Sequence, residues 1–469
     1  MKLLILESST TSAKAMLFDS ETMQQKIVSR PYGFAQNSNG THDGEEVFCK
    51  TASLAKEISS GTSVDMILQG TTWHSLIVCA KDGTPMSLVE LWSYTKASDL
   101  CAKLNAVPGF AKNYYKNTGC LVNSSYPYFK LMKKKEDAAL PKDCRLGGQG
   151  VYNTFRLTGK WVTTLSMASG SGLINIDTRS YDKDLLSKIN VSESQLPRIA
   201  DYTETFPLTK EGAALLGQKE GIPVVPAYPD GALNQIGSGA LEQGIMSFSV
   251  GTSAAIRITA KKKLLPAAPS LWSYFVLSSH LLGGATSGAC NCQDWFKQKF
   301  FPEGTTYKEI ESRLSHTRDT PVFLPFLFGE RCPGWNEKRT GGFLCVRPEH
   351  NVFDLYQAVL EGILFNVYQC YEILVKTAGE PDVIKLSGGI LHSDIWTQMC
   401  ADLFGKKMSL DMSDQSSVMG CAVIGMHLTG KLNSPADFRP AIGKTVEPNM
   451  EVHEAYIKKF QKYLELYKK

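Results

Sequence analysis

Residues 3–19 read LLILESSTTSAKAMLFD, and residues 245–260 read IMSFSVGTSAAIRITA. Each stretch has an apolar run, a short turn of small residues and a second apolar run, which is typical of two strands joined by a tight turn. When Ser9 is aligned with Gly251, the polar and apolar pattern of the next four residues also matches. The two copies lie about half a chain apart and predict duplicated domains. Five small residues match easily by chance, so the echo is weak alone.

The rest of the chain reads as strands connected by helices, which favours α/β layers. Apolar residues recur at helical spacing over residues 354–375, and residues 382–389 read as a strand that ends in glycines. A helix follows, opened by Ser393 and closed by Gly405, and a polar-faced helix ends the chain. The 469 residues suit two large domains, and we expect them at residues 1–242 and 243–469.

Composition excludes several classes of protein. The chain is 43% hydrophobic and 20% charged, as in a soluble globular protein, and a net charge of +4 does not predict nucleic-acid binding. Twelve cysteines without zinc spacing indicate a reducing, cytoplasmic compartment, although Cys290 and Cys292 could also bind metal. The short apolar start predicts a first strand, not a signal peptide. The chain contains no run of 18 apolar residues, so we expect no membrane helix.

Three stretches carry small residues where a phosphate could approach the backbone. The turns at residues 9–12 and 251–253 offer hydroxyls and N–H groups to an anion, although each turn alone is explained as well by an ordinary hairpin. Gly388 and Gly389 end a strand before a helix and leave room for a ring or a phosphate. Neither a P-loop nor a dinucleotide-binding glycine motif is present.

Asp230 is the acid in YPDGALNQIGSGA, residues 228–240, where a Pro–Gly turn becomes a helix of small residues. Read locally, Asp230 is a helix N-cap. The small residues that follow predict that this helix packs tightly against another element.

The chain resembles the FGGY family of carbohydrate kinases over nearly its whole length, and three of its motifs resemble the gluconate kinase branch most. The motifs occur in the family's order: SSTTSAK (8–14), GTTWHSLIVCAKDGTP (70–85) with Trp92, FRLTGKWV (155–162), PDGALNQIGSGA (229–240), SVGTSAAIR (249–257), FLPFLFGERCPGWN (323–336), KLSGGILHSDIWTQMCADLFGKK (385–407) and SSVMGCAVIG (416–425). The resemblance implies two ribonuclease-H-like domains, as in actin and hexokinase, with the active site in the cleft between them. It also implies ATP and Mg²⁺, and a small sugar or sugar acid as acceptor.

The resemblance gives roles to individual residues. Asp230 matches the general base, and the free N–H groups at its helix start should keep its carboxylate ionised. Glu7 and Asp230 match the metal-binding positions. Phosphate contacts fall on Ser9, Thr10, Thr11 and Lys14 in the first turn and on Gly251, Thr252 and Ser253 in the second; the adenosine falls on Gly388 and Gly389, and the acceptor on Trp73, His74, Tyr94, Lys96 and Asp230.

The chain departs from the family pattern at five positions. Glu7 stands where the family has Asp, and Ser9 adds bulk where it has Gly. Tyr94 and Val151 replace acidic residues, and Lys96 replaces Arg. The loss of acidic residues favours an anionic acceptor such as an aldonate, with Lys96 as a possible partner of its carboxylate. The same loss also fits a protein that is losing catalytic activity.

The sequence therefore predicts an ATP-dependent kinase that acts on a gluconate-like acid first and a ketopentose such as xylulose second. The rivals are a catalytically weak sugar- or nucleotide-binding relative and an actin- or chaperone-like ATPase. We expect no membrane and no nucleic-acid partner, and the sequence leaves a homodimer open.

Overall fold

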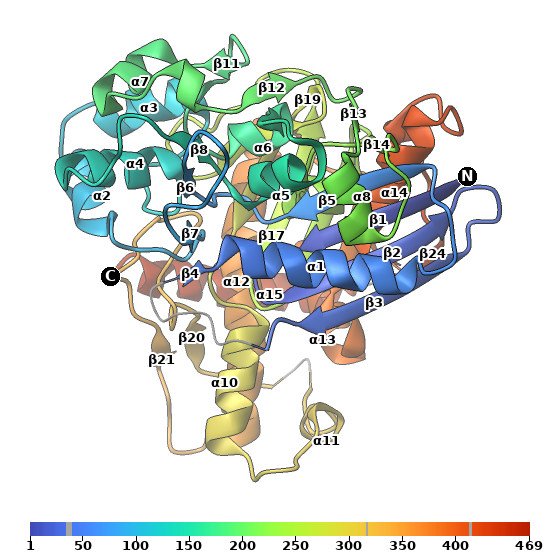
Figure 1. Cartoon of the computed structure of the whole chain (residues 1–469). Helices are drawn as coiled ribbons and strands as arrows, with labels where there is room; N and C mark the ends of the chain where they lie inside the picture. The colour runs from blue at the N-terminus through green and yellow to red at the C-terminus, as the bar shows by residue number, and fades with distance from the viewer. Residues whose placement is uncertain (34–39, 316–317, 412–414) are drawn as a thin grey trace.

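The computed structural model describes residues 1–33, 40–315, 318–411 and 415–469. Two seven-stranded sheets form its framework (Figure 1). The first runs β13 (Phe206–Pro207), β14 (Pro223–Val224), β5 (Met66–Thr71), β1 (Lys2–Ser8), β2 (Ser12–Asp19) and β3 (Gln25–Pro31), with β15 (Tyr228–Pro229) paired to β5. The second runs β18 (Trp272–Val276), β19 (Ser279–Ala285), β17 (Ala254–Ala260), β16 (Ile245–Val250), β22 (Val383–Gly388), β23 (Met408–Asp411) and β24 (Ile442–Val446).

The two sheets repeat one plan, which explains the echo in the sequence. In the first, β1 pairs antiparallel with β2 and parallel with β5. In the second, β16 pairs antiparallel with β17 and parallel with β22. Ser9 and Gly251 each follow directly after the first strand of a hairpin, so the alignment from sequence is correct up to the turns. It is wrong by one residue in the second strand, because Ser8 pairs with Ala13 whereas Val250 pairs with Ala254, so the first turn is one residue longer. Because one sheet ends at residue 229 and the other starts at 245, we infer a domain boundary near residue 242.

Helices cover both sheets. Those of the N-terminal half are α1 (Gly44–Ile58), α2 (Ser98–Asn105), α3 (Phe110–Thr118), α4 (Pro127–Glu136), α5 (Gln149–Thr158), α6 (Leu165–Ser169), α7 (Lys183–Ile189), α8 (Lys210–Leu216) and α9 (Asp230–Gly237). Those of the C-terminal half are α10 (Cys290–Phe300), α11 (Tyr307–Glu311), α12 (Val352–Ala378), α13 (Asp394–Phe404), α14 (Ser416–Leu428) and α15 (Met450–Tyr467). In Figure 1, α1 lies across the strands β1 to β3, and α2, α3, α4 and α7 form a separate layer of the N-terminal half.

Short strand pairs complete the fold. They are β4 (Thr41–His42) with β7 (Val89–Glu90), β6 (Ile77–Cys79) with β8 (Arg145–Gly147), β9 (Val162–Thr164) with β12 (Arg198–Ala200), β10 (Ile174–Asn175) with β11 (Ser180–Tyr181), and β20 (Val322–Leu324) with β21 (Gly342–Leu344).

Several helices predicted from sequence are confirmed. The helix predicted over 354–375 is α12, which begins with a capping box at Asn351. Ser393 caps α13, and Gly405 ends it in the left-handed region with φ 58°. Within the described part of the chain, α12 alone is long and apolar enough to cross a membrane. However, 83% of its most apolar window is buried inside the protein, as expected of a core helix.

The helix that follows Asp230 packs against α14, as its small residues predict. A Cβ on Gly237 would lie 1.9 Å from the carbonyl oxygen of Ser416, and a Cβ on Gly420 would lie 2.2 Å from that of Leu233. The backbones of α9 and α14 therefore touch directly. The side chain of Gln235 on α9 also bonds Thr259 and Ser247 of the second sheet, so this helix pair joins the two halves.

Candidate active site

The first turn closes on itself through a serine. The Ser9 hydroxyl donates to the Ser12 carbonyl oxygen at 2.7 Å and accepts from the Ser12 amide at 3.2 Å. The hydroxyl group is therefore used within the turn. Trp92 donates from Nε1 to the Thr10 hydroxyl at 3.3 Å, which fixes the tryptophan beside this turn. Thr11 is exposed.

The second turn and the paired glycines come together. The Gly251 amide bonds the Ser253 carbonyl at 2.9 Å, and Thr252 is exposed. Gly388 has φ +90°, and a Cβ there would lie 2.4 Å from the Val250 carbonyl oxygen, immediately before the turn. Only glycine allows this close approach without strain. The residues expected to hold the nucleotide in the C-terminal half are thus neighbours.

Glu7 is held by partners from both halves of the chain. It is buried, and it lies opposite Lys14 in the β1–β2 ladder, with Nζ 3.3 Å from Oε1. Its other oxygen, Oε2, accepts a short hydrogen bond from Ser417 on α14. Lys14, expected at the phosphate, therefore contacts Glu7 in this structure. No group of three or more His, Cys, Asp or Glu side chains that could hold a metal occurs among the described residues, so Cys290 and Cys292 form no such group.

Asp230 is the first residue of α9 and is partly exposed. Pro229 is the N-cap, and the carboxylate makes no capping bond; Oδ1 accepts only from the adjacent Gly231 amide, at 2.7 Å. Burial raises the pKa of Asp230 above its ordinary value. The Gly231 amide, the charge of Arg257 and the Trp73 amide oppose this rise, while the charge of Glu7 adds to it.

One expectation about Asp230 is therefore wrong, because Pro229, and not Asp230, is the N-cap of the helix. The cost of burying the charge exceeds the gain from the nearby N–H groups and raises the pKa, and an ionised carboxylate at neutral pH stays a prediction. The charge of Glu7 acts on Asp230, which indicates that the two carboxylates expected to bind metal lie in the same region.

Trp73 and His74 form a rigid wall next to Asp230. Trp73 is buried and donates from Nε1 to the Ser166 carbonyl at 2.9 Å. His74 has φ +66°, a conformation that is uncommon for a residue with a side chain and is concentrated at functional sites. Its Nδ1 lies 2.6 Å from the Gly170 carbonyl oxygen, which can only accept, so Nδ1 carries the proton. Burial lowers the pKa of His74 to about 3, and the ring is neutral.

A buried lysine supports this wall. Lys130 is 1% exposed, and its ammonium group donates to the carbonyl oxygens of His74, Glu90 and Leu91 at 2.7, 3.2 and 2.6 Å. It thereby ties the unusual backbone of His74 to the segment that leads to Trp92. The pattern KLMKKK gave no signal that the first of these lysines is buried.

Aromatic side chains from both halves meet around Trp73 and His74. Tyr274 of β18 lies with its ring centre 5.1 Å from that of Trp73 and 5.7 Å from that of His74. Its hydroxyl bonds the Tyr126 hydroxyl at 2.6 Å. Trp272 stacks on Tyr274 at 4.5 Å. The site therefore lies where the two domains join.

Two arginines of this region, one near Asp230 and one at Trp92, were not predicted. Arg257 of β17 is 7% exposed; Nη1 donates to Ser249 at 3.3 Å, and Nε is buried without a partner. Arg331 follows Glu330 in the C-terminal half and lies with its guanidinium carbon 5.6 Å from the Trp92 ring centre. Both residues stand inside quoted motifs, SVGTSAAIR and FGERCPGWN, and that position was the available signal.

Tyr94 and Lys96 lie at the edge of the candidate site. Lys96 is exposed, with its ammonium group 5.8 Å from the Tyr94 ring centre. Burial, and then the charge of nearby Glu90, raises the pKa of Tyr94. Glu90 is itself paired with Lys134 at 2.6 Å. In the described part of the chain, no contact joins Lys96 to Asp230, Trp73 or His74.

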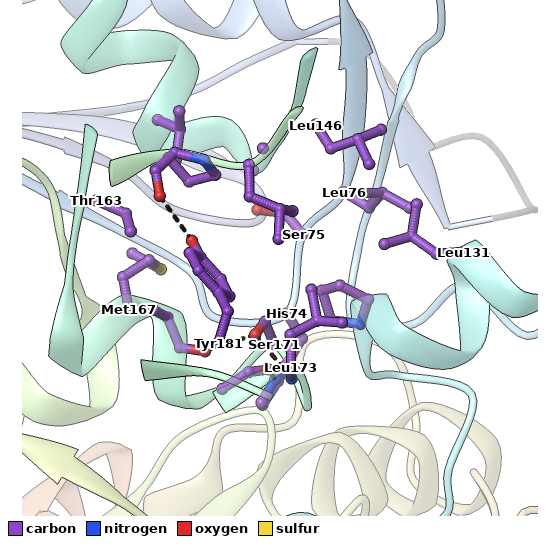
Figure 2. Close-up of a pocket in the computed structure, with 18 residues that line it drawn as sticks. His74, Ser75, Leu76, Leu131, Leu146, Thr163, Met167, Ser171, Leu173 and Tyr181 are labelled. Carbon is purple, nitrogen blue, oxygen red and sulfur yellow. Dashed lines mark hydrogen bonds between the residues drawn. The ribbon is translucent and has the colours of Figure 1, made fainter. Parts of the chain in front are cut away.

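A small cavity lies next to His74 (Figure 2). It has a volume of about 60 Å³ and is lined mainly by apolar side chains, including Val151, Leu146 and Met167, with His74 at its edge. At about 10–15 Å³ per water, this holds a few waters, too little for a six-carbon acid. Tyr181 closes one side by donating to the Pro197 carbonyl at 2.8 Å. Val151 therefore faces this cavity.

The sequence matches two family models that together span most of the chain. The model described as "FGGY family of carbohydrate kinases, N-terminal domain" matches residues 3–237, and the corresponding C-terminal domain matches residues 246–429. Gluconokinase from Bacillus licheniformis is 25% identical over 94% of this chain and 90% of its own length.

Two solved structures from Lactobacillus acidophilus have the same fold. Its gluconate kinase superposes with a TM-score of 0.93 at 26% identity and covers 99% of this chain and 98% of its own. Its ligand-bound xylulose kinase gives the same TM-score and identity and covers 99% and 97%. The predicted actin- and hexokinase-like architecture of two α/β domains is confirmed.

Proposed function

Because this chain belongs to the FGGY family of carbohydrate kinases, we propose that it transfers the γ-phosphoryl group of ATP to a hydroxyl of a sugar acid, with gluconate as the first candidate. The observation that carries the proposal is the setting of Asp230. Its partly exposed carboxylate lies next to Trp73, and the charges of Glu7 and Arg257 act on it.

Asp230 is the general base in this proposal. Its carboxylate takes the proton of the acceptor hydroxyl as that oxygen bonds to the γ-phosphorus, the bond from phosphorus to the bridging oxygen breaks, and ADP leaves. A base works best when its pKa lies near the working pH. The raised pKa of Asp230 fits this role better than an ordinary aspartate pKa would.

The two hairpin turns and the paired glycines would hold ATP. Thr10 and Thr11 stand in the first turn, Thr252 and Ser253 in the second, and Gly388 borders the second turn. Proteins hold Mg²⁺ through one or two carboxylates together with substrate phosphates. Glu7 and Asp230 fit that donor set, and the ion would neutralise charge on the phosphates.

The absence of two acidic residues supports an anionic acceptor. Tyr94 and Val151 stand where acidic residues were expected, and neither is acidic. A site with fewer carboxylates repels an anionic acceptor less. Similarity to gluconokinase points the same way.

A ketopentose such as xylulose is the second candidate, because the xylulose kinase structure is as similar as the gluconate kinase structure. A catalytically weak relative is the third, because Glu7, Ser9 and Tyr94 differ from the family pattern.

The test is acceptor-dependent ADP formation by the purified chain with ATP and Mg²⁺. Gluconate, xylulose and a sample without acceptor are compared at matched concentrations. A higher kcat/KM with gluconate supports the proposal. A higher value with xylulose supports the second candidate, and ADP formation that no acceptor stimulates contradicts both.

A further inference from the structure

Arg257 and Arg331 are two cations of this region, and the charge of Asp230 acts on Arg257 without a close ion pair between them. Within the ranges that the structure describes, no carboxylate forms an ion pair with either side chain. Arg257 uses one donor on the neutral Ser249 hydroxyl, and its Nε has no partner. Arg331 is half-buried, and its guanidinium group lies over the face of Trp92. Buried polar groups normally have hydrogen-bond partners, so the Nε of buried Arg257 indicates space for an acceptor group that the described residues do not supply.

The two side chains share one location. The positive charge of Arg331 acts on Arg257, on His74 and on Tyr274, so Arg331 lies within electrostatic range of each of these three groups. Arg257 also borders Gly231, next to Asp230: a Cβ on Gly231 would lie 3.4 Å from its Nε and 2.4 Å from the Trp73 ring. The pair therefore flanks the aromatic wall beside Asp230.

We propose that Arg257 and Arg331 form a subsite that binds the carboxylate group of the acceptor. The inference rests on the proposed function and names the residues that would select a sugar acid. It also replaces Lys96, the partner expected from sequence, which is exposed and lies with its ammonium group 5.8 Å from the Tyr94 ring centre. Guanidinium groups suit the task because their planar donors match a carboxylate in pairs.

The position of Arg257 separates this subsite from the phosphate turns. Arg257 lies four residues beyond Ser253, or about 13 Å along a strand at about 3.3 Å per residue. Its contacts are with Gly231 and Ser249, and Asp230 lies within electrostatic range. A carboxylate bound here would lie near Asp230 and away from the phosphate turns.

The arginines also connect acid binding to the domain junction. Arg257 and Arg331 belong to the C-terminal half, whereas Asp230, Trp73 and Trp92 belong to the N-terminal half. An acceptor held at both ends would bridge the two domains.

The experiment compares gluconate with two neutral acceptors. Arg331→Met removes the charge and keeps an unbranched side chain, and Arg257→Lys keeps charge but loses the paired donors. Lys338→Met is the matched control, because Lys338 is exposed in the same segment and pairs only with exposed Asp99. Rates are measured with gluconate and xylulose, and equilibrium affinity is measured by calorimetry with gluconate and glucitol, in which CH₂OH replaces the carboxylate.

Each arginine variant should lose about tenfold to hundredfold in kcat/KM and affinity for gluconate, the range for one charge-assisted contact. The kcat/KM for xylulose and the affinity for glucitol should stay within about threefold of the wild-type values. Lys338→Met should resemble the wild type with every compound. Equal losses with gluconate and xylulose would place the arginines on the phosphoryl group and overturn the inference. So would loss of the acid preference in Lys96→Met alone.

The outcomes also separate this inference from the proposed function. A wild-type enzyme that prefers xylulose overturns both. A wild-type enzyme that prefers gluconate, with variants that keep the preference, overturns the inference alone. If Arg331→Met does not fold, Arg331→Lys tests the same contact, since a lysine retains the charge but not the paired donors, and an unchanged preference there is equally contrary.

Discussion

Asp230→Asn is the substitution that tests the mechanism most directly. Asparagine has the same shape, and its Oδ1 can still accept the Gly231 amide, now bonded at 2.7 Å. Pro229 is the helix N-cap, so α9 does not depend on the charge. What the substitution removes is the proton acceptor, and general-base catalysis typically contributes about 10²–10⁴-fold. We expect acceptor-dependent turnover to fall by that factor, with ATP affinity nearly unchanged.

The stability of Asp230→Asn should equal or exceed that of the wild type, although its turnover falls. Because burial raises the pKa of Asp230, the folded state disfavours its charged form, and the neutral amide removes that cost. The melting temperature at neutral pH should therefore stay the same or rise. The penalty on the wild type is present above its raised pKa and disappears as the pH falls toward the ordinary value of 3.8, so the two melting curves should converge in acid.

Asp43→Asn is the matched control. Asp43 is an exposed true N-cap, whose Oδ1 accepts from Glu45 and Glu46 at 2.9 Å, and Asn and Asp are about equal in this role. Its turnover should equal that of the wild type. The assay is coupled ADP release, with ATP titration and thermal melting in parallel. Near-native turnover of Asp230→Asn would refute the role of Asp230 as base.

Further predictions concern pH, packing and motion. The kcat/KM of the wild type should fall in acid with an inflection above 3.8, because the base must be ionised, and Asp230→Asn should lack that inflection. Gly420→Ala should destabilise the protein by about 1–3 kcal/mol in urea unfolding, because its Cβ would lie 2.2 Å from the Leu233 oxygen; an unchanged midpoint would contradict direct α9–α14 contact. ATP with acceptor should lower the radius of gyration in small-angle scattering, and no change with both ligands bound would count against closure. Glu337→Gln should raise that radius without ligands, since the Glu337 carboxylate accepts from Ser98, Asn123 and Ser124 of the other domain.

Much of the fold could be predicted from local patterns. Apolar spacing gave the existence of α12, and Ser393 and Gly405 gave both ends of α13, because caps and periodicity act within a few residues. The match between the turns at Ser9 and Gly251 gave the duplicated plan of the two sheets, but it did not give the register of the second strand, because the first turn is one residue longer than the second. Small residues after Asp230 gave a tightly packed helix, though not its partner α14.

The candidate site was predicted in part. The motifs indicated the turns, the glycines and the Trp73–His74 pair. The prediction for Lys96 came from its place in a motif, and the structure leaves that side chain exposed. Lys130 was not predicted to be part of the site, since nothing in the sequence separates it from the lysines at 133–135, while the structure buries it against three carbonyl groups.

The sequence by itself determined which residues form strands, turns and helices, because hydrogen bonding and capping depend on neighbours in the chain. Only the tertiary structure decided which charges meet. Arg257, Arg331 and Asp230 come from three distant segments, and the pKa of Asp230 depends on the protein packed around it. A helix start alone predicts a lower pKa for that acid. Desolvation and Coulomb energy depend on distances in space, and folding brings these groups together across the domain junction.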